Sequence, residues 1–161
     1  MPQKDHTTFI ADVMVGRLAR YLRMAGYDVK YMNDADDELI VNIARKENRV
    51  VLTRDTMMLE RRQFRQGVLR SVFIRHDSLE KQLLQVSSDL DIELEPDLVV
   101  CLVCNSPLED VEKRDISGEV PPYVYRTQDS FKYCSSCEKY YWRGTHYEYI
   151  KKFFDGLKSM R

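Results

Sequence analysis

The sequence predicts an α/β protein, with a mostly parallel sheet covered by helices on both faces, followed by a small cysteine-anchored module. Two observations carry this prediction. The first ninety or so residues alternate between short apolar runs and segments with helical spacing, which is typical of successive strand-then-helix units. All four cysteines then fall in two C-x-x-C pairs in the second half of the chain.

The composition sets the size and charge of the molecule. The chain has 161 residues, of which 43% are hydrophobic, enough for one ordinary domain with a small appendage. Its 25 basic and 26 acidic residues give a net charge of −1, so any binding of a polyanion depends on local clusters. The N-terminus lacks a secretory signal, and the longest apolar run, 98–104, is far shorter than a membrane span. We therefore expect a cytoplasmic protein without a membrane contact.

The elements of the first half follow in order. Residues 8–13 are a short apolar run that predicts a strand, and Gly26 is expected to cap the helix after it. Residues 27–31 alternate as a strand does, and a second helix is expected after the acidic residues 34–37. The β-branched run 49–55 predicts a third strand.

Two further elements and a boundary complete this half. A third helix is expected to carry Met58, Leu59 and Phe64. Residues 71–75 predict a fourth strand, and the fourth helix is expected to open at Asp77 or Ser78.

The acidic stretch 89–97 then breaks the alternation. We expect an α/β domain over residues 8–95 and a ribbon with a C-terminal helix over residues 96–161.

The cysteines predict a structural zinc site. A C-x-x-C turn presents two thiolates, and two such turns complete the tetrahedral set that one zinc ion prefers. With all four ligands used, such a zinc folds the module and leaves no open position for catalysis. The alternatives are two disulfides or free buried thiols. The expected ligands are Cys101, Cys104, Cys134 and Cys137.

Acidic residues follow three of the expected strands. Asp12 comes after the first strand, Asp37 with Asp36 beside it opens the second helix, and Asp55 follows the third strand. These places converge on one edge of a parallel sheet. Clustered carboxylates call for a hard cation such as Mg²⁺ or Mn²⁺, which can activate a water for phosphodiester cleavage. The alternative is that these residues only cap helices.

Arginines are concentrated beside these acids. Arg17, Arg20 and Arg23 recur every third residue and are expected to form one stripe, and six more arginines lie between residues 54 and 75. Guanidinium groups next to carboxylates suit a site that holds a phosphodiester backbone. The alternative is a solvated helix face.

Three ordered strings resemble one known family. They are DVMVGRLARYLRMAGYDVKY, DADDELIVNIARKENRVVLTRD and, after the cysteine pairs, KYYWRGTHYEYI. Together they resemble the PIN-like ribonuclease domain with a C-terminal zinc ribbon, which is also found at the C-terminus of Mut-seven exonuclease proteins. The resemblance covers roughly residues 9 to 154. It implies a Rossmann-like PIN fold, metal-dependent endonucleolytic cleavage of RNA, and a ribbon that helps to bind RNA or to shape the site.

The resemblance also assigns residues to roles. The catalytic acids of the family fall on Asp12, on Asp37 with Asp36 as its rival, and on Asp55. The G-R-L-A-R stretch supplies Arg17 and Arg20.

Two parts of the family pattern are less clear in this chain. A fourth acid soon after the third is absent before Glu60, and Asp77 either replaces it or belongs to a capping box. The Y-W-x-G-x-H signature places Trp142 and His146 in the ribbon, where His146 is either an RNA contact or a packed ribbon histidine.

We therefore expect a metal-dependent ribonuclease, a hydrolase that cuts single-stranded or unpaired RNA, with one structural Zn²⁺ and catalytic Mg²⁺ or Mn²⁺. Arg17, Arg20 and Arg54 would orient the phosphate, and ribbon aromatics such as Trp142 would stack on bases. RNA is the expected partner, with the ribosome or ribosomal RNA among the candidates. The alternative is a non-catalytic RNA- or ribosome-binding protein on the same scaffold. A third hypothesis is a toxin-like component that acts with a partner protein.

Overall fold

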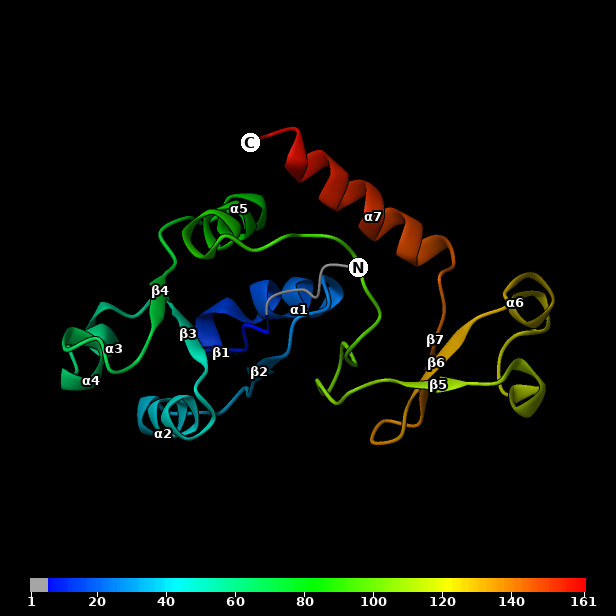
Figure 1. The fold of residues 1–161 in the computed structure, drawn as a ribbon, viewed down its shortest axis with the longest axis horizontal. Coiled ribbons are helices and arrows are strands. Elements are labelled where there is room, and N and C mark those ends of the chain that lie inside the picture. The colour runs from blue at the N-terminus through cyan, green and yellow to red at the C-terminus, as the bar shows by residue number, and fades with distance from the viewer. Residues whose placement is uncertain (1–5) are drawn as a thin grey trace.

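The computed structural model describes residues 6–161; residues 1–5, on which part of the expectation about a secretory signal rests, lie outside the described residues. Its first half follows the expected alternation of strands and helices (Figure 1). In chain order the elements are β1 Phe9–Ala11, η1 Val13–Val15, α1 Gly16–Met24, β2 Val29–Tyr31, α2 Asp37–Glu47, β3 Val50–Thr53, α3 Thr56–Leu59, α4 Arg62–Arg65, β4 Ser71–Phe73 and α5 Leu79–Leu90.

The four strands of this half form one parallel sheet in the order β2-β1-β3-β4. The register pairs Ile10 of β1 with Lys30 of β2 on one side and with Val51 of β3 on the other. The two central strands are buried on both faces, which is why their sequences are continuous apolar runs. The predicted α/β fold with a parallel sheet is confirmed.

Helices cover both faces of the sheet (Figure 1). On one face Phe9 packs with Leu18 of α1 and Leu83 of α5. On the other face Ile10 packs with Ile40 of α2. Adjacent residues of β1 thus enter opposite layers, as the two-residue period of a strand requires.

The structure tests three details that the sequence predicts for the first half. The expected third helix is two short helices, because Arg61 between α3 and α4 has extended backbone. The N-cap of α5 is Ser78, whose side chain accepts the amide of Lys81, while Asp77 bonds elsewhere. The Gly26 cap is confirmed, since this residue has a φ of +85° just after α1.

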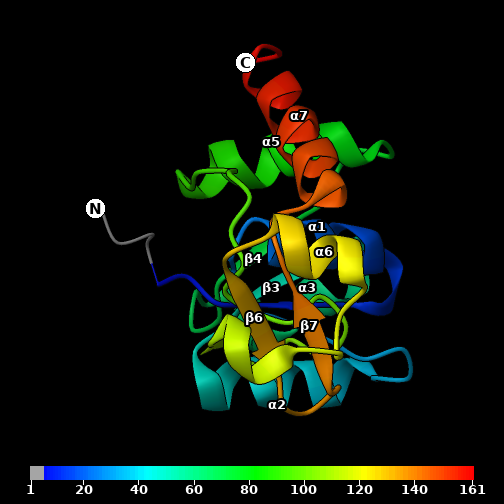
Figure 2. The same ribbon diagram turned by 90° about the vertical axis from the view of Figure 1, so that its right-hand side faces the viewer.

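The second half is a small antiparallel ribbon followed by a long helix. Its elements are β5 Glu109–Val111, η2 Lys113–Ile116, α6 Pro122–Thr127, β6 Phe131–Cys134, β7 Lys139–Tyr141 and α7 Thr145–Lys158, with sheet order β5-β6-β7. α7 returns to the first half, where Phe154 and Leu157 join the core that contains Leu22 and Leu83 (Figure 2). None of the described helices has the length and hydropathy needed to span a membrane.

Arg23 ties the ribbon to the sheet and is not part of an exposed arginine stripe. Three helical residues turn about 300°, so each step of three shifts the stripe by about 60° and brings Arg23 to the buried side of α1. Its side chain is buried and donates to the carbonyl of Val29 at 2.9 Å, and to those of Leu102 and Val103 at 3.1 and 3.2 Å. The predicted stripe is therefore wrong at Arg23.

A second contact fixes the same joint. The side chain of Asn105 accepts the amide of Val29 at 2.9 Å and donates to Asp28 at 2.6 Å. Asp28 also receives Arg49 at 2.7 Å. Burial of Asp28 opposes ionisation, but the hydrogen bonds from Arg49 and Asn105 outweigh it, so the pKa of this carboxyl is lowered. The ribbon is thus attached by directional polar bonds.

Arg23→Met is expected to destabilise the protein by ~2–4 kcal/mol, because it keeps the apolar stem but leaves buried carbonyl groups without a donor. Arg20→Met, on an exposed position of the same helix, is expected to change stability by less than ~0.5 kcal/mol. Urea unfolding of both variants measures the difference. Equal stabilities would show that the Arg23 contacts do not hold the joint.

Candidate functional site

Asp12 and Asp55 lie at the carboxyl edge of two neighbouring parallel strands. Asp12 directly follows β1 and its amide donates to the carbonyl of Leu52 in β3 at 3.0 Å. The hydroxyl of Thr53 donates to the carboxylate of Asp12 and accepts the amide of Asp55 at 2.9 Å. One buried hydroxyl therefore connects the two acids.

Asp36 and Asp37 open α2, and the structure gives them different surroundings. Asp36 is exposed and caps the helix, because its carboxylate accepts the amide of Leu39 at 2.8 Å. Asp37 is half-buried, and the negative charges of both Asp55 and Asp12 act on it. Asp37 therefore lies with the strand-end acids, and we call Asp12, Asp37 and Asp55 the acidic cluster.

The surroundings of Asp37 in the acidic cluster disfavour its charged form. Burial raises the pKa of Asp37 above its usual value, and the charges of Asp55, Asp12 and Asp36 raise it further, while Arg61 opposes them. A carboxylate in this position costs stability at neutral pH unless a cation neutralises it. This is the electrostatic condition under which a hard cation binds.

The acidic cluster is more open than the cysteine site. Among residues 6–161, the four cysteines are the only group of three or more such ligands whose atoms all lie within 4.8 Å of one another. An open arrangement suits Mg²⁺, which usually keeps several waters and binds through one or two carboxylates together with a phosphate. The donor set of the acidic cluster therefore fits Mg²⁺ or Mn²⁺.

The predicted phosphate-binding arginines divide into two kinds. Arg17 and Arg20 are exposed on α1 and form no ion pair with a described residue. Arg54 donates to Asp77 at 2.6 Å, and this contact lowers the pKa of the Asp77 carboxyl. Asp77 is therefore engaged as the partner of Arg54, which explains why it does not cap α5.

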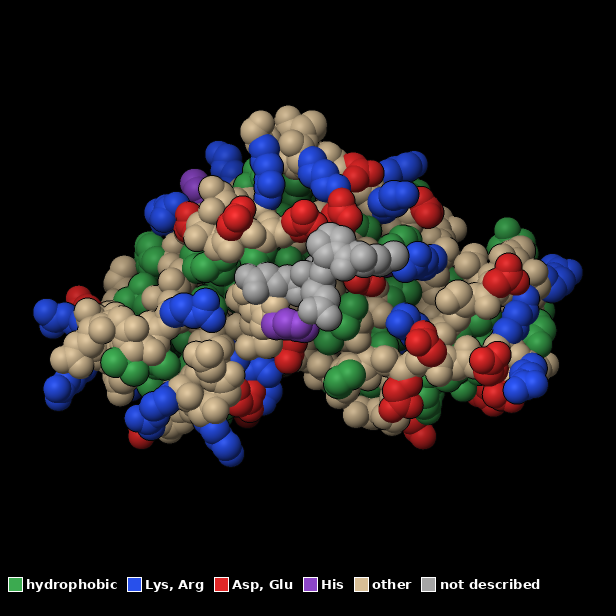
Figure 3. All heavy atoms as spheres, in the orientation of Figure 1, with side chains coloured by type: hydrophobic (Ala, Val, Ile, Leu, Met, Phe, Trp, Pro, Cys, Tyr) green, Lys and Arg blue, Asp and Glu red, His purple; other side chains and the backbone are tan. Residues whose placement is uncertain are grey.

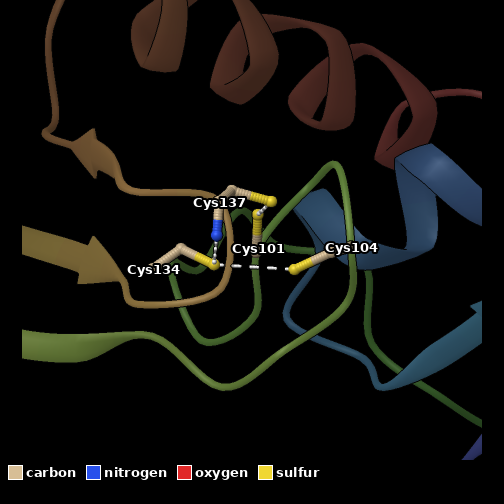
Figure 4. Close-up of side chains that lie close together, drawn as sticks. All are labelled: Cys101, Cys104, Cys134 and Cys137. Atoms are coloured by element: carbon tan, nitrogen blue, oxygen red, sulfur yellow. Dashed lines mark hydrogen bonds between the residues drawn. The ribbon is translucent and has the colours of Figure 1, made fainter.

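The four cysteines gather into one group whose sulfur atoms all lie within 4.8 Å of one another (Figure 4). The sulfurs of Cys101 and Cys137 are 3.9 Å apart, and those of Cys104 and Cys134 are 3.5 Å apart. Zinc–sulfur bonds of 2.3 Å in a tetrahedron give sulfur separations of about 3.8 Å. All four thiols are free, so the alternative of two disulfides is wrong, and the set can hold a structural metal such as zinc.

The two C-x-x-C turns have the same backbone design. The residue after each second cysteine, Asn105 or Glu138, has a positive φ, of 67° and 54°. In the first turn Cys104 is exposed, and burial opposes its ionisation; hydrogen bonds from Ser106 outweigh this and bring the pKa of the thiol to about 6. An ionised thiol is the form that binds a metal.

In the Y-W-x-G-x-H signature of the ribbon, Trp142 packs against a neighbouring ring and His146 lies on the surface. The ring of Trp142 packs against Phe131 at 6.3 Å, and a Cβ on Gly144 would come within 2.7 Å of the indole nitrogen of Trp142. Gly144 is therefore required for the position of Trp142. His146 is exposed in the first turn of α7, free to contact a ligand.

Two polar residues with clear roles, Thr53 and Asn105, were not singled out from the sequence, and Arg23 was assigned a different role. Thr53 orients Asp12, and Arg23 and Asn105 attach the ribbon. A signal existed only for Thr53, as the polar end of an otherwise apolar strand. Nothing in the spacing of the chain indicates that Arg23 and Asn105 both bond to Val29, although Asn105 lies 76 residues beyond Val29.

The fold and these two sites define an α/β protein with a nuclease-like acidic sheet edge and a cysteine ribbon. The family model described as the Mut7-C RNAse domain matches residues 7–154, nearly the whole chain, and the chain belongs to this family. No curated protein and no solved structure matches the chain.

Removal of metal from the cysteine site is expected to unfold the ribbon, because the ribbon sheet has only a small apolar core of its own. Trp142, the one tryptophan of the chain, lies in that core and its fluorescence should shift to the red on chelation. Elemental analysis should give one zinc per chain, and added zinc should restore the spectrum. A metal-free protein with an unchanged Trp142 spectrum would contradict the structural role.

Proposed function

We propose that the protein is an endoribonuclease that uses a divalent metal ion, Mg²⁺ or Mn²⁺, to cut single-stranded or unpaired RNA. The observation that carries the proposal is the convergence of the acidic cluster, in which the charges of Asp55 and Asp12 raise the pKa of Asp37. Membership of the Mut7-C RNAse domain family supports an RNase-related activity.

The acids of the cluster would hold the catalytic ion. When bound, such an ion supplies a water of lowered pKa and neutralises charge on the phosphate. Asp12 is pre-oriented, because the Thr53 hydroxyl and the amide of Met14, at 2.8 Å, fix its two oxygens. Asp37 and Asp55 would complete the ligand set, although Asp55 also caps α3; Asp36 only caps α2.

The arginines near the acidic cluster would bind the phosphate backbone. Arg17 and Arg20 are exposed on α1 and free of ion pairs with described residues. Arg54 would have to exchange its bond to Asp77 for a phosphate oxygen. Because Asp77 is almost fully exposed, water screens this pair and the exchange costs little. The zinc ribbon, joined to the sheet through Arg23, would support this surface and supply contacts such as His146.

Asp12→Asn and Asp37→Asn are each expected to lower the rate of Mn²⁺-dependent cleavage of single-stranded RNA at least ~100-fold, because each removes a ligand charge. Asp36→Asn is the matched control: asparagine also caps a helix, so this variant should cut within about threefold of wild type. Product formation on labelled RNA gives the rates.

A binding measurement accompanies the rates. Mn²⁺ should raise the melting temperature of wild type and of Asp36→Asn but have a smaller effect on Asp37→Asn, because a ligand of the folded state stabilises it. If Asp12→Asn cuts as fast as wild type, the acidic cluster is not the catalytic site. If wild type binds RNA in a salt-dependent way but yields no product with Mg²⁺ or Mn²⁺, the protein is the non-catalytic RNA-binding alternative.

A further inference from the structure

Four large apolar side chains are exposed next to the acidic cluster, and neither the core nor the proposed catalysis uses them. They are Val13, Met14, Leu39 and Met57, which we call the apolar collar. Met14 is 63% and Met57 74% exposed, although burial of apolar surface is favourable. Exposed apolar side chains around a polar site are typical of an interaction surface.

Hydrogen bonds fix the collar to the acids. The amide of Met14 donates to Asp12 at 2.8 Å, and the amide of Met57 donates to Asp55 at 2.9 Å. The amide of Leu39 donates in the same way to Asp36, next to Asp37. Three of the four collar side chains therefore start from a backbone position that an aspartate of this sheet edge holds in place.

The first part of the collar is held in a defined turn. The hydroxyl of Tyr31 donates to the carbonyl of Val13 at 3.2 Å. A Cβ on Gly16 would come within 2.6 Å of the Tyr31 ring, so glycine at this position allows the contact. The backbone around Met14 is therefore held in one conformation, so this part of the collar can bind a partner without first becoming ordered.

The charges around the collar indicate the chemistry of that partner. Arg17 and Arg20 lie about one and two turns beyond Met14. Arg61 is close enough to Asp37 for its positive charge to oppose the rise in the pKa of that carboxyl. None of the three forms an ion pair with a residue in 6–161. Figure 3 shows further Lys and Arg side chains at the end of the molecule that α3 and α4 form. The partner should therefore carry anionic groups and apolar faces together.

A single strand of RNA has this combination, because its phosphates alternate with bases whose faces are open. The bases of a duplex are stacked and cannot reach side chains on a flat rim. A second copy of the chain fits poorly, since a two-fold interface would place each acidic cluster close to its own copy and bring like charges together.

We propose that the apolar collar, with Met14 and Met57 as its main contacts, binds unpaired bases beside the scissile phosphate and so selects single-stranded RNA. This inference rests on the proposed function and names the feature of the substrate that the site selects. The polarizable thioether of methionine suits contact with aromatic faces. The structure thus assigns base contact to the sheet edge, in addition to the ribbon aromatics.

The test measures RNA binding by fluorescence anisotropy without added divalent cations, so that the RNA stays intact. The double variant Met14→Ser/Met57→Ser should bind a labelled single-stranded 12-mer about tenfold more weakly than wild type, because both thioether contacts with base faces are removed. Binding to a duplex of the same sequence should be unchanged. Met160→Ser, an exposed methionine near the C-terminus, is the matched control and should bind as wild type.

A second substrate separates base contacts from backbone contacts. Wild type should bind an oligonucleotide with abasic sites about tenfold more weakly than the intact strand, and this difference should be much smaller for the double variant. If the double variant binds intact RNA as wild type does, or loses affinity for abasic and intact strands alike, the proposal is wrong. In the first case an apolar protein segment becomes the occupant to seek.

The two proposals fail separately. Loss of base selection in the double variant does not depend on the acids, because the binding assay contains no cleavage step. Cleavage that persists in Asp12→Asn overturns the catalytic proposal alone. Melting temperatures of the double variant and wild type should agree within a few degrees, since both methionine side chains are solvent-exposed.

Discussion

Asp12 and Thr53 meet in a buried hydrogen bond at the ends of two adjacent parallel strands, and the rest of the site is arranged around it. Parallel pairing of β1 with β3 makes the contact possible, because it brings the carboxyl ends of both strands to one edge. The same hydroxyl accepts the amide of Asp55 and so fixes the second acid. The third acid, Asp37, is supplied by the first turn of α2.

This arrangement concentrates negative charge at one edge of the sheet, where Asp12 and Asp55 also accept backbone amides. Burial and the neighbouring carboxylates raise the pKa of Asp37 and so disfavour its charged form. Local rules of stability are commonly violated at functional sites. The exposed Met14 and Met57 violate a second rule at the same edge, and one explanation, contact with an RNA strand and its metal ion, accounts for both.

The fold and the cysteine site could be predicted from the sequence to a large extent. Strand-like and helical spacings of apolar residues are visible within short stretches of the sequence. Paired C-x-x-C motifs indicate a metal site more often than disulfides where thiols stay reduced. Three-residue spacing was a poor guide at Arg23, because the helix rotates that position into the interior. The contacts of Asn105 with Asp28 and Val29 join distant parts of the chain and leave no local pattern.

The candidate acids show the same limit. Asp36 and Asp37 are adjacent and of the same residue type, so the sequence cannot distinguish their roles. The direction of α2 makes Asp36 the helix cap and brings Asp37 towards Asp55. Asp77 had two interpretations in the sequence, and the structure shows a third, an ion pair with Arg54. Side-chain partners across the sheet edge decide these roles.

The central claim is that the acidic cluster binds a divalent metal ion. Anomalous diffraction from crystals of the wild-type protein soaked in Mn²⁺ tests it most directly, because manganese is located without reference to activity. The account predicts a manganese peak in contact with Asp12 and with Asp37 or Asp55, and a separate zinc peak among the four cysteines. A metal peak at the cysteines alone, with none at the acidic cluster, would contradict it.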